Sequence, residues 1–235
     1  MKHEMPVALA TPEKLKEKTF VVNPEAREPL WVNLVEGQLA GVEDEKRREG
    51  LEQVIEGVKK KSLEYMQLVI RLSRHSEKMR VDPERHKAHV EAIDQMRRIK
   101  HNALISDIDI IARNYGQEEL DVSWRSQFRS REALGEWALQ IATHELASRY
   151  PKPERELSLD SIAKDRNISG SVTSEALDAA SFMIDAHLRP EDPGCERDAT
   201  LAIEHYKKYW PELKLSESET RDLILQVTSR NIYGH

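Results

Sequence analysis

The chain has 235 residues, which is enough to bury a full hydrophobic core in one large domain or two small ones. Charged residues make up 33% and hydrophobic residues 39%, a composition that favours helices, while the single cysteine excludes a disulfide framework and a cysteine-rich zinc site. The net charge of −6 argues against indiscriminate nucleic-acid binding by the whole molecule.

Residues 1–42 are predicted to form an extended N-terminal arm, because four prolines break any long helix there. Two short runs rich in β-branched or aromatic residues, 19–22 and 30–35, fit strands or extended segments laid across a helical surface, with Trp31 as a packing anchor. The arm has no basic segment followed by an apolar one, and the chain has no run of ~18 apolar residues. We therefore expect neither secretion nor a membrane span.

Two long amphipathic helices are predicted over residues 42–80 and 83–115, because apolar residues recur there at helical spacing between charged ones. Pro83 separates them, since proline disfavours helical geometry in the preceding residue and suits a first helical turn. Gly116 is placed to cap the second helix. So short a turn predicts an antiparallel hairpin. We expect contacts of Tyr65, Met66 and Val69 with Ile93, Met96 and Ile99 or their neighbours.

Shorter helices follow the hairpin. A connector over 117–129 leads to a helix over 130–150, which Pro151 ends. Further helices are predicted at 159–166, 173–188, 196–209 and 217–230. The predicted fold is all-α, with a long antiparallel helical hairpin, a C-terminal bundle of shorter helices and the extended N-terminal arm. We divide it into the arm (1–42), a helical module with the hairpin (43–150) and a C-terminal helical module (151–235).

Charge is distributed unevenly along the chain. From Lys46 to Arg113 there are 16 Lys and Arg against 11 Asp and Glu, so the hairpin is basic and the remainder acidic. Phosphate neutralisation dominates nucleic-acid affinity, so any such binding is expected in the hairpin. The residues that would make the contacts are Lys59, Lys60, Lys61, Arg71 and Arg74.

One stripe of the second predicted helix carries polar residues where apolar ones are expected. Residues from Ile93 to Tyr115 recur along it in steps of three and four, and Arg97 and His101 belong to it. Asp94 precedes Arg97 by three residues, within reach of an ion pair. Folding the hairpin back places Glu64 near His101, as a counter-charge for that histidine or for Arg97.

This cluster has two explanations, a polar clasp that fixes the register of two helices or a functional site. A buried arginine without a partner costs several kcal/mol, so a partner for Arg97 is required if it is enclosed. No catalytic residue is assigned. The candidates are Arg97, Arg98, His101, Asn102, Glu64 and Asp94.

The segment from Arg97 to Asp107 resembles a family of small uncharacterised bacterial helical proteins. It reads Arg-Arg-Ile-Lys-His-Asn-Ala-Leu-Ile-Ser-Asp, and the family shares its Arg-Arg-x-x-His-Asn-Ala-Leu-Ile pattern. The resemblance extends over about residues 45–116. It implies a bacterial origin and a helical module, and brings no activity with it.

A second resemblance is to the higher-eukaryote and prokaryote nucleotide-binding (HEPN) ribonucleases, which present Arg and His from one helix face. It implies proton transfer by His101 and stabilisation of a phosphorane-like charge by Arg97 or Arg98. Three residues separate Arg97 from His101, which is closer than in that family.

Two further motifs are weaker. His86, His89, Asp94, His101 and Asp107 are permitted metal ligands, but His101 lies about 18 Å beyond His89 at 1.5 Å per helical residue, so we expect no metal site. Residues 158–178 are similar to a helix-turn-helix, yet the second helix is acidic and would be repelled by phosphates.

The sequence therefore predicts a non-enzymatic helical interaction or regulatory protein of the bacterial cytoplasm, without cofactor. A protein is the expected partner, a homo-oligomer is compatible with the sequence, and no membrane contact is expected. Ribonuclease activity and nucleic-acid binding through the hairpin are the alternatives. A polar cluster lining an open groove would favour an enzyme, whereas a buried and paired cluster would favour a binding protein.

Overall fold

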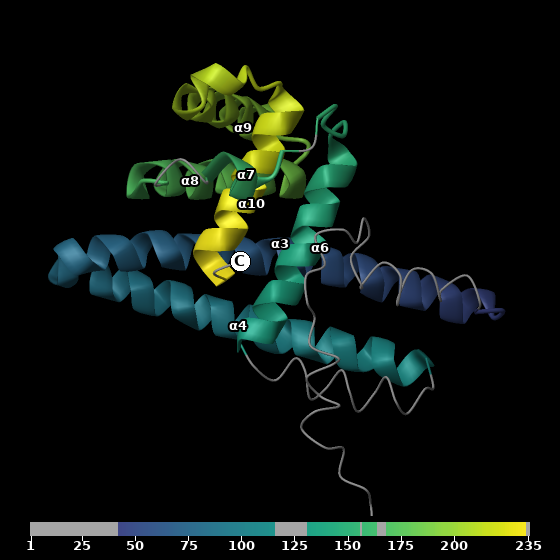
Figure 1. The fold of residues 1–235 in the computed structure, drawn as a ribbon. Helices are drawn as coiled ribbons and strands as arrows, with labels where there is room; N and C mark the ends of the chain where they lie inside the picture. The colour runs from purple at the N-terminus through teal and green to yellow at the C-terminus, as the bar shows by residue number, and fades with distance from the viewer. Residues whose placement is uncertain (1–41, 116–130, 156, 164–167, 234–235) are drawn as a thin grey trace, which may run out of the picture.

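The computed structural model describes residues 42–115, 131–155, 157–163 and 168–233. The predicted arm with Trp31, the connector and the capping Gly116 lie outside the described residues. Within the described part every regular element is a helix, so the all-α class is confirmed (Figure 1). None of the helices in this described part has the length and apolar character needed to cross a membrane.

Two long helices dominate the structure, α3 (Glu45–Val81) and α4 (Pro83–Tyr115). Asp44 caps α3 by accepting a hydrogen bond from the backbone N–H of Arg47 at 2.9 Å. Asp82 stands between the helices and accepts from the N–H of Arg85 at 3.2 Å, so it caps α4. The break predicted from Pro83 is therefore made by an Asp-Pro pair.

The helices α3 and α4 lie side by side in Figure 1 and contact each other along their length. The pairs of residues in contact show that the two helices run in opposite directions. Lys61 meets Asp107, and further along α3 Tyr65 meets Arg97. Near the turn the rings of His75 and His89 are 5.7 Å apart. Residue numbers thus rise on α3 as they fall on α4, as in an antiparallel hairpin.

The face of α4 that meets α3 is narrower than predicted. Ile93 is buried with Leu68 and Leu72 of α3 near the turn. Met96 and Ile99 are 43% and 61% exposed, and their neighbour Arg97 is the residue that contacts Tyr65. At 100° per residue Met96 lies about 60° and Ile99 about 120° around the helix from Ile93, so Met96 borders the interface and Ile99 points away from it.

The remaining helices are α6 (Arg131–Arg149), α7 (Leu159–Ala163), α8 (Gly170–Leu188), α9 (Pro193–Tyr206) and α10 (Glu217–Tyr233), with two 3-10 turns between α9 and α10. α8 and α9 begin three residues earlier than predicted. Ser169 and Asp192 cap them, and their side chains accept from Val172 and Gly194 N–H groups.

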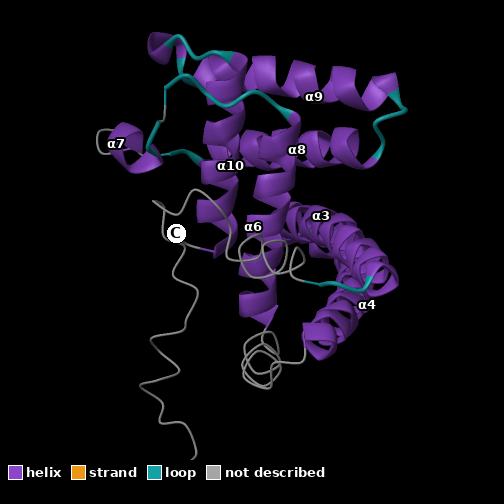
Figure 2. Cartoon of the chain, turned by 90° about the vertical axis from the view of Figure 1, so that its right-hand side faces the viewer, coloured by secondary structure: helices purple, strands orange, loops and turns teal. Residues whose placement is uncertain are grey.

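α8 is the central helix of this part of the structure. It lies beside α9 and also contacts α3, α6 and α10 (Figure 2). A helix enclosed in this way cannot enter a DNA groove, so the likeness to a helix-turn-helix does not extend to a recognition helix. Its buried residues are Ala176, Leu177, Ala179, Ala180, Met183, Ile184 and Ala186.

One hydrophobic cluster extends from Leu51 on α3 to Val227 on α10. It therefore includes residues from both segments that the sequence assigned to separate modules. Polar pairs join the same segments, since Arg74 of α3 binds Asp178 of α8 at 2.5 Å and Gln67 donates to Asp185 at 2.5 Å. The division at residue 150 stays a prediction.

Candidate functional site: the polar cluster of α4 and the adjoining groove

Arg97 lies in the interface between α4 and α3 and is only 5% exposed. Its Nε and Nη2 atoms reach the same oxygen of Asp94, at 2.9 and 2.8 Å. Its Nη1 atom donates to the hydroxyl of the buried Tyr65 at 3.4 Å. The guanidinium is thus held within the hairpin by one partner from each helix.

Asp94 binds two arginines of very different exposure. Its second oxygen accepts from Nε of Arg98 at 2.9 Å, and the Arg98 side chain is 72% exposed. Burial by itself would lower the pKa of Arg97, but the contacts with Tyr65 and Asp94 outweigh it, and the pKa is raised. Arg97 therefore keeps its charge in the interface, and the carboxylate of Asp94 compensates it.

Glu64 does not serve as the counter-charge of Arg97. Glu64 forms an ion pair with Lys100, which lies one turn after Arg97 on α4, at the edge of the interface between the two helices. Asp94 lies on the same helix as Arg97 and needs no long-range register to reach it, so it takes that role. The sequence predicted the need for a partner, and the structure shows which carboxylate provides it.

The residues named for a ribonuclease differ in their exposure. His101 is half-buried against α3, with its ring 6.2 Å from the ring of Tyr65. Arg98 and Asn102 are exposed on α4, while Arg97 is buried under Asp94. A phosphate at the surface of α4 reaches the exposed Arg98, whereas Arg97 is enclosed and already paired with Asp94.

A groove of about 470 Å³ lies beside the cluster, between α3, α4 and the end of α10. Its size is within the range of small-molecule sites. Of the candidate residues only Asp94 lines it, and that carboxylate already binds two arginines. Among the described residues, the groove is also lined by the polar side chains of Ser73, Ser76, Glu91 and Asn231.

Most of the cations expected to bind nucleic acid are neutralised by carboxylates. Lys61 binds Asp107 at 2.5 Å, Arg74 binds Asp178 at 2.5 Å, and Lys59 lies 3.7 Å from Glu145 of α6. Carboxylates of α4 itself, of α6 and of α8 therefore compensate part of the positive charge of the hairpin. Lys60 and Arg71 remain exposed.

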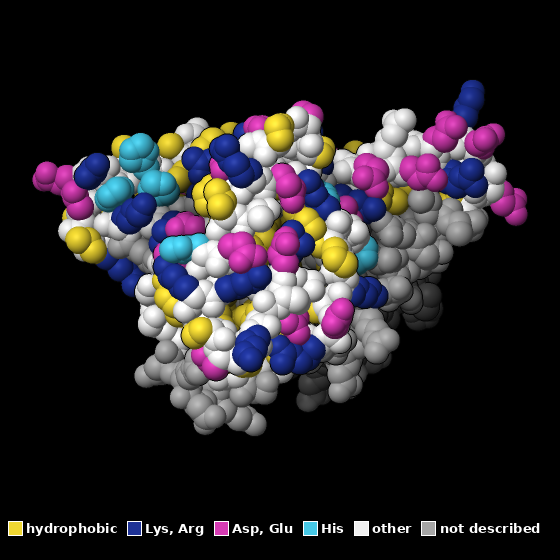
Figure 3. Space-filling model, turned by 90° about the horizontal axis from the view of Figure 1, so that it is seen from above, with side chains coloured by type: hydrophobic (Ala, Val, Ile, Leu, Met, Phe, Trp, Pro, Cys, Tyr) yellow, Lys and Arg dark blue, Asp and Glu magenta, His cyan; other side chains and the backbone are white. Residues whose placement is uncertain are grey.

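Three histidines gather at the turn end of the hairpin, and the sequence reasoning found only two of them. The ring of His75 on α3 lies 5.7 Å from that of His89 and 6.0 Å from that of His86. Figure 3 shows histidine side chains close together among Lys and Arg side chains at this end. His75 and His89 lie equally far from Asp82 at the turn, on opposite helices of the hairpin. This symmetry about the turn could have located His75 from the sequence.

Positive charge lies close to the histidine cluster. Burial lowers the pKa of His75 first, followed by the positive charge of Lys78 and by the two neighbouring histidines. No group of three His, Cys, Asp or Glu side chains suited to a metal ion occurs among the described residues.

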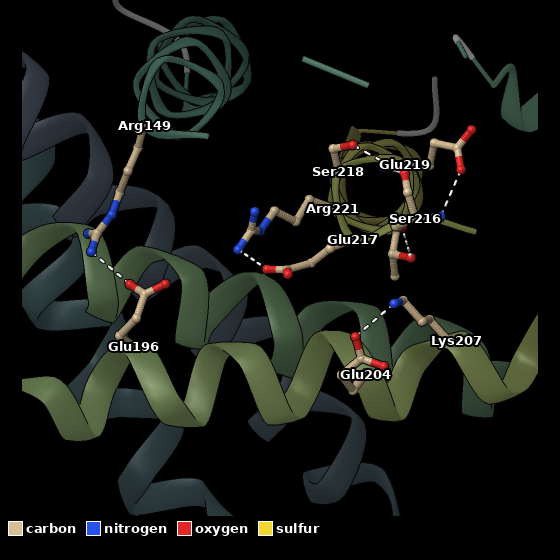
Figure 4. A network of polar contacts seen from close by, with 10 residues as sticks. Arg149, Glu196, Glu204, Lys207, Ser216, Glu217, Ser218, Glu219 and Arg221 are labelled. Atoms are coloured by element: carbon tan, nitrogen blue, oxygen red, sulfur yellow. Dashed lines mark hydrogen bonds and ion pairs between the residues drawn. The ribbon is translucent and has the colours of Figure 1, made fainter. Parts of the chain in front are cut away.

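A second polar network joins the ends of α6, α8, α9 and α10 (Figure 4). Arg149 binds Glu196 of α9 at 2.7 Å and donates to the carbonyl of Ala186 on α8. Arg221 pairs with Glu217, and its guanidinium lies 3.6 Å from the ring centroid of Tyr150. These contacts tie four helix ends together, a structural role that explains the polar residues there.

The start of α10 carries a signal that the sequence reasoning missed. Ser216 and Glu219 form a capping box, in which the Ser216 N–H donates to the Glu219 carboxylate at 2.8 Å and the Glu219 N–H donates to the Ser216 hydroxyl at 3.3 Å. The Ser-x-x-Glu spacing alone could have located it. The same carboxylate accepts from Arg155 at 2.9 Å.

Residues 40–141 match the model of a family described as a protein of unknown function (DUF3232). The match covers less than half of the chain and includes α3, α4 and the first part of α6. No curated protein and no solved structure matches the chain. This match agrees with the expected likeness to an uncharacterised family. The matched residues include the whole polar cluster of α4.

Proposed function

We propose that this protein is a non-enzymatic helical interaction protein that presents the outer face of α4 to a protein partner. The observation that carries the proposal is the exposure of large apolar side chains on that face. Met96, Ile99 and Ile110 are 43%, 61% and 40% exposed, at helical spacing. Single exposed apolar residues are ordinary, but several in line on one helix are typical of a partner-binding face.

The placement of the polar cluster supports the same proposal. Arg97 is enclosed and paired with Asp94 and Tyr65, so the residues richest in chemistry hold α4 in register on α3. α4 packs chiefly against α3 among the described elements, which leaves its opposite side available. The hairpin is then a rigid support for a binding face.

The setting that we propose is the cytoplasm of a bacterium. The only cysteine, Cys195, is a buried free thiol, which fits a reducing compartment. Burial raises the pKa of this thiol, so it is unreactive near neutral pH. The bacterial origin rests on the resemblance of the segment from Arg97 to Asp107.

Site-specific photocrosslinking in cells tests the proposed face. A photoreactive phenylalanine derivative at position 99 is expected to form a protein adduct, and the same group at the exposed Lys60 on α3 serves as the matched control. Adducts at position 60 alone, or none at positions 96, 99 and 110, would contradict the proposal.

A nuclease assay tests the main alternative. Purified wild-type protein is expected to leave labelled single-stranded RNA intact, because Arg97 is enclosed and paired with Asp94. RNA cleavage that is lost in His101→Ala, with unchanged thermal stability, would replace the interaction proposal by a ribonuclease.

A further inference from the structure

We infer that the partner on the outer face of α4 is a second copy of this chain, with the two α4 helices antiparallel about a two-fold axis between Ile99 and Ala103. This inference rests on the proposed function, because it names the partner for the same face. Two-fold dimers are the commonest oligomers, and each copy contributes the same patch to their interface.

The outer face has the residue spacing of a helix-pairing seam. The stripe Ala92, Met96, Ile99, Ala103, Ser106 and Ile110 advances in alternating steps of four and three. This is the narrow seam of paired helices, whereas a helix that packs on a broad core shows a wider apolar face. The stripe contains no charged residue, so a second helix can cover it without desolvating an ion. The shape of the stripe therefore selects another helix as its occupant.

Side-chain size favours the antiparallel arrangement of two copies. With the axis between Ile99 and Ala103, Ile99 lies opposite Ala103 of the second copy and Met96 lies opposite Ser106. Ala92 then lies opposite Ile110. Every large side chain meets a small one, which allows close packing along the whole seam. In a parallel pair each residue would face itself, and crowded layers would alternate with empty ones.

The flanks of the seam are also complementary in this register. On one side the amide of Gln95 lies opposite the carboxylate of Asp109 of the second copy. On the other side the Glu64–Lys100 ion pair lies beside its own symmetry mate. The two ammonium groups and two carboxylates can then alternate around the axis, so that each charge has opposite charges as neighbours. This self-complementarity is the reason for choosing a second copy over an unrelated protein.

Sedimentation velocity of the full chain over a range of concentrations tests the dimer. We expect a concentration-dependent dimer in the wild type and at least a thirtyfold weaker dimer in Ile99→Lys. The matched control is Val81→Lys, since Val81 is an 88% exposed apolar residue at the hairpin turn, away from the seam. Circular dichroism of both variants checks the fold. A dimer weakened equally by both substitutions, or by neither, would overturn the inference.

Disulfide crosslinking tests the register, in a Cys195→Ser background. A mixture of Ala92→Cys and Ile110→Cys proteins is expected to form a crosslink between the two variants. Ala92→Cys alone is expected to form none, because two copies of position 92 lie about 27 Å apart at 1.5 Å per residue. Efficient crosslinking of Ala92→Cys to itself would show a parallel pair and refute the proposed arrangement.

The tests separate this inference from the function on which it rests. A wild-type protein that stays monomeric but forms an adduct with another protein at position 99 would overturn the second copy as partner and keep the proposed interaction face. An adduct within the same chain at position 99 would show that another segment of the chain covers the stripe, and would overturn both. A dimer that follows the predicted pattern supports both.

Discussion

At the scale of single residues, Arg97 and Arg98 bind the same carboxylate but differ in exposure, 5% for Arg97 against 72% for the Arg98 side chain. We expect Arg97→Ala to lower the free energy of unfolding by about 3 kcal/mol, because it leaves Asp94 and Tyr65 without their buried partner. Arg98→Ala should cost less than ~1 kcal/mol, because solvent screens an exposed pair. Urea denaturation measures both, and equal losses would contradict the clasp.

The histidines predict how stability depends on pH. The pKa of His75 is lowered by burial and by nearby positive charge, and the pKa of His187 is lowered by burial, against the opposing effect of Glu145. The folded state therefore binds these protons less readily than the unfolded state, whose histidines have a pKa of about 6.5. The free energy of unfolding should therefore not depend on these two histidines well above pH 6.5. It should fall as the pH drops through 6.5, and it should level off once the pH is below the folded-state pKa values.

Urea denaturation at several pH values between 5 and 8 checks this dependence. The double variant of His75→Gln and His187→Gln is expected to show a flatter profile than the wild type over this range. His205→Gln is the control, since that side chain is exposed. An unchanged profile in the double variant would show that other groups cause the pH dependence.

At the scale of elements, the capping box of α10 should contribute measurably to stability. Ser216→Ala removes the acceptor of the Glu219 N–H, and we expect a loss of about 1 kcal/mol in the free energy of unfolding. Ser218→Ala is the control, because its hydroxyl meets that of Ser216 at 3.2 Å instead of a backbone amide. Chemical denaturation compares the two variants, and a loss as large in Ser218→Ala would argue against the capping role.

At the scale of the whole molecule, the shared core predicts one cooperative unfolding transition. The hydrophobic cluster joins α3 to α8 and α10, and the Arg74–Asp178 pair links the hairpin to the C-terminal helices. Tryptophan fluorescence and far-ultraviolet circular dichroism should therefore give coincident urea transitions. Two separated transitions would instead support independent modules divided near residue 150.

The helices themselves could be predicted from the sequence, since apolar periodicity, proline breaks and charge placement act over a few residues. Local chemistry also predicted that Asp94 can reach Arg97, because three residues on one helix bring the two side chains together. The starts of α8 and α9 were missed because Ser169 and Asp192 cap them one turn before the apolar pattern begins.

The sequence by itself determined the all-α class, the two long helices and the need for a partner beside Arg97, because these follow from spacing along one helix. Only the tertiary structure decided that Glu64 pairs with Lys100, that His75 joins His86 and His89, and that Met96 and Ile99 face outward. Each of these depends on the rotation of one helix about its axis relative to another. A rotation of 100°, one residue step, exchanges a buried position for an exposed one, and packing against the other helices sets that rotation.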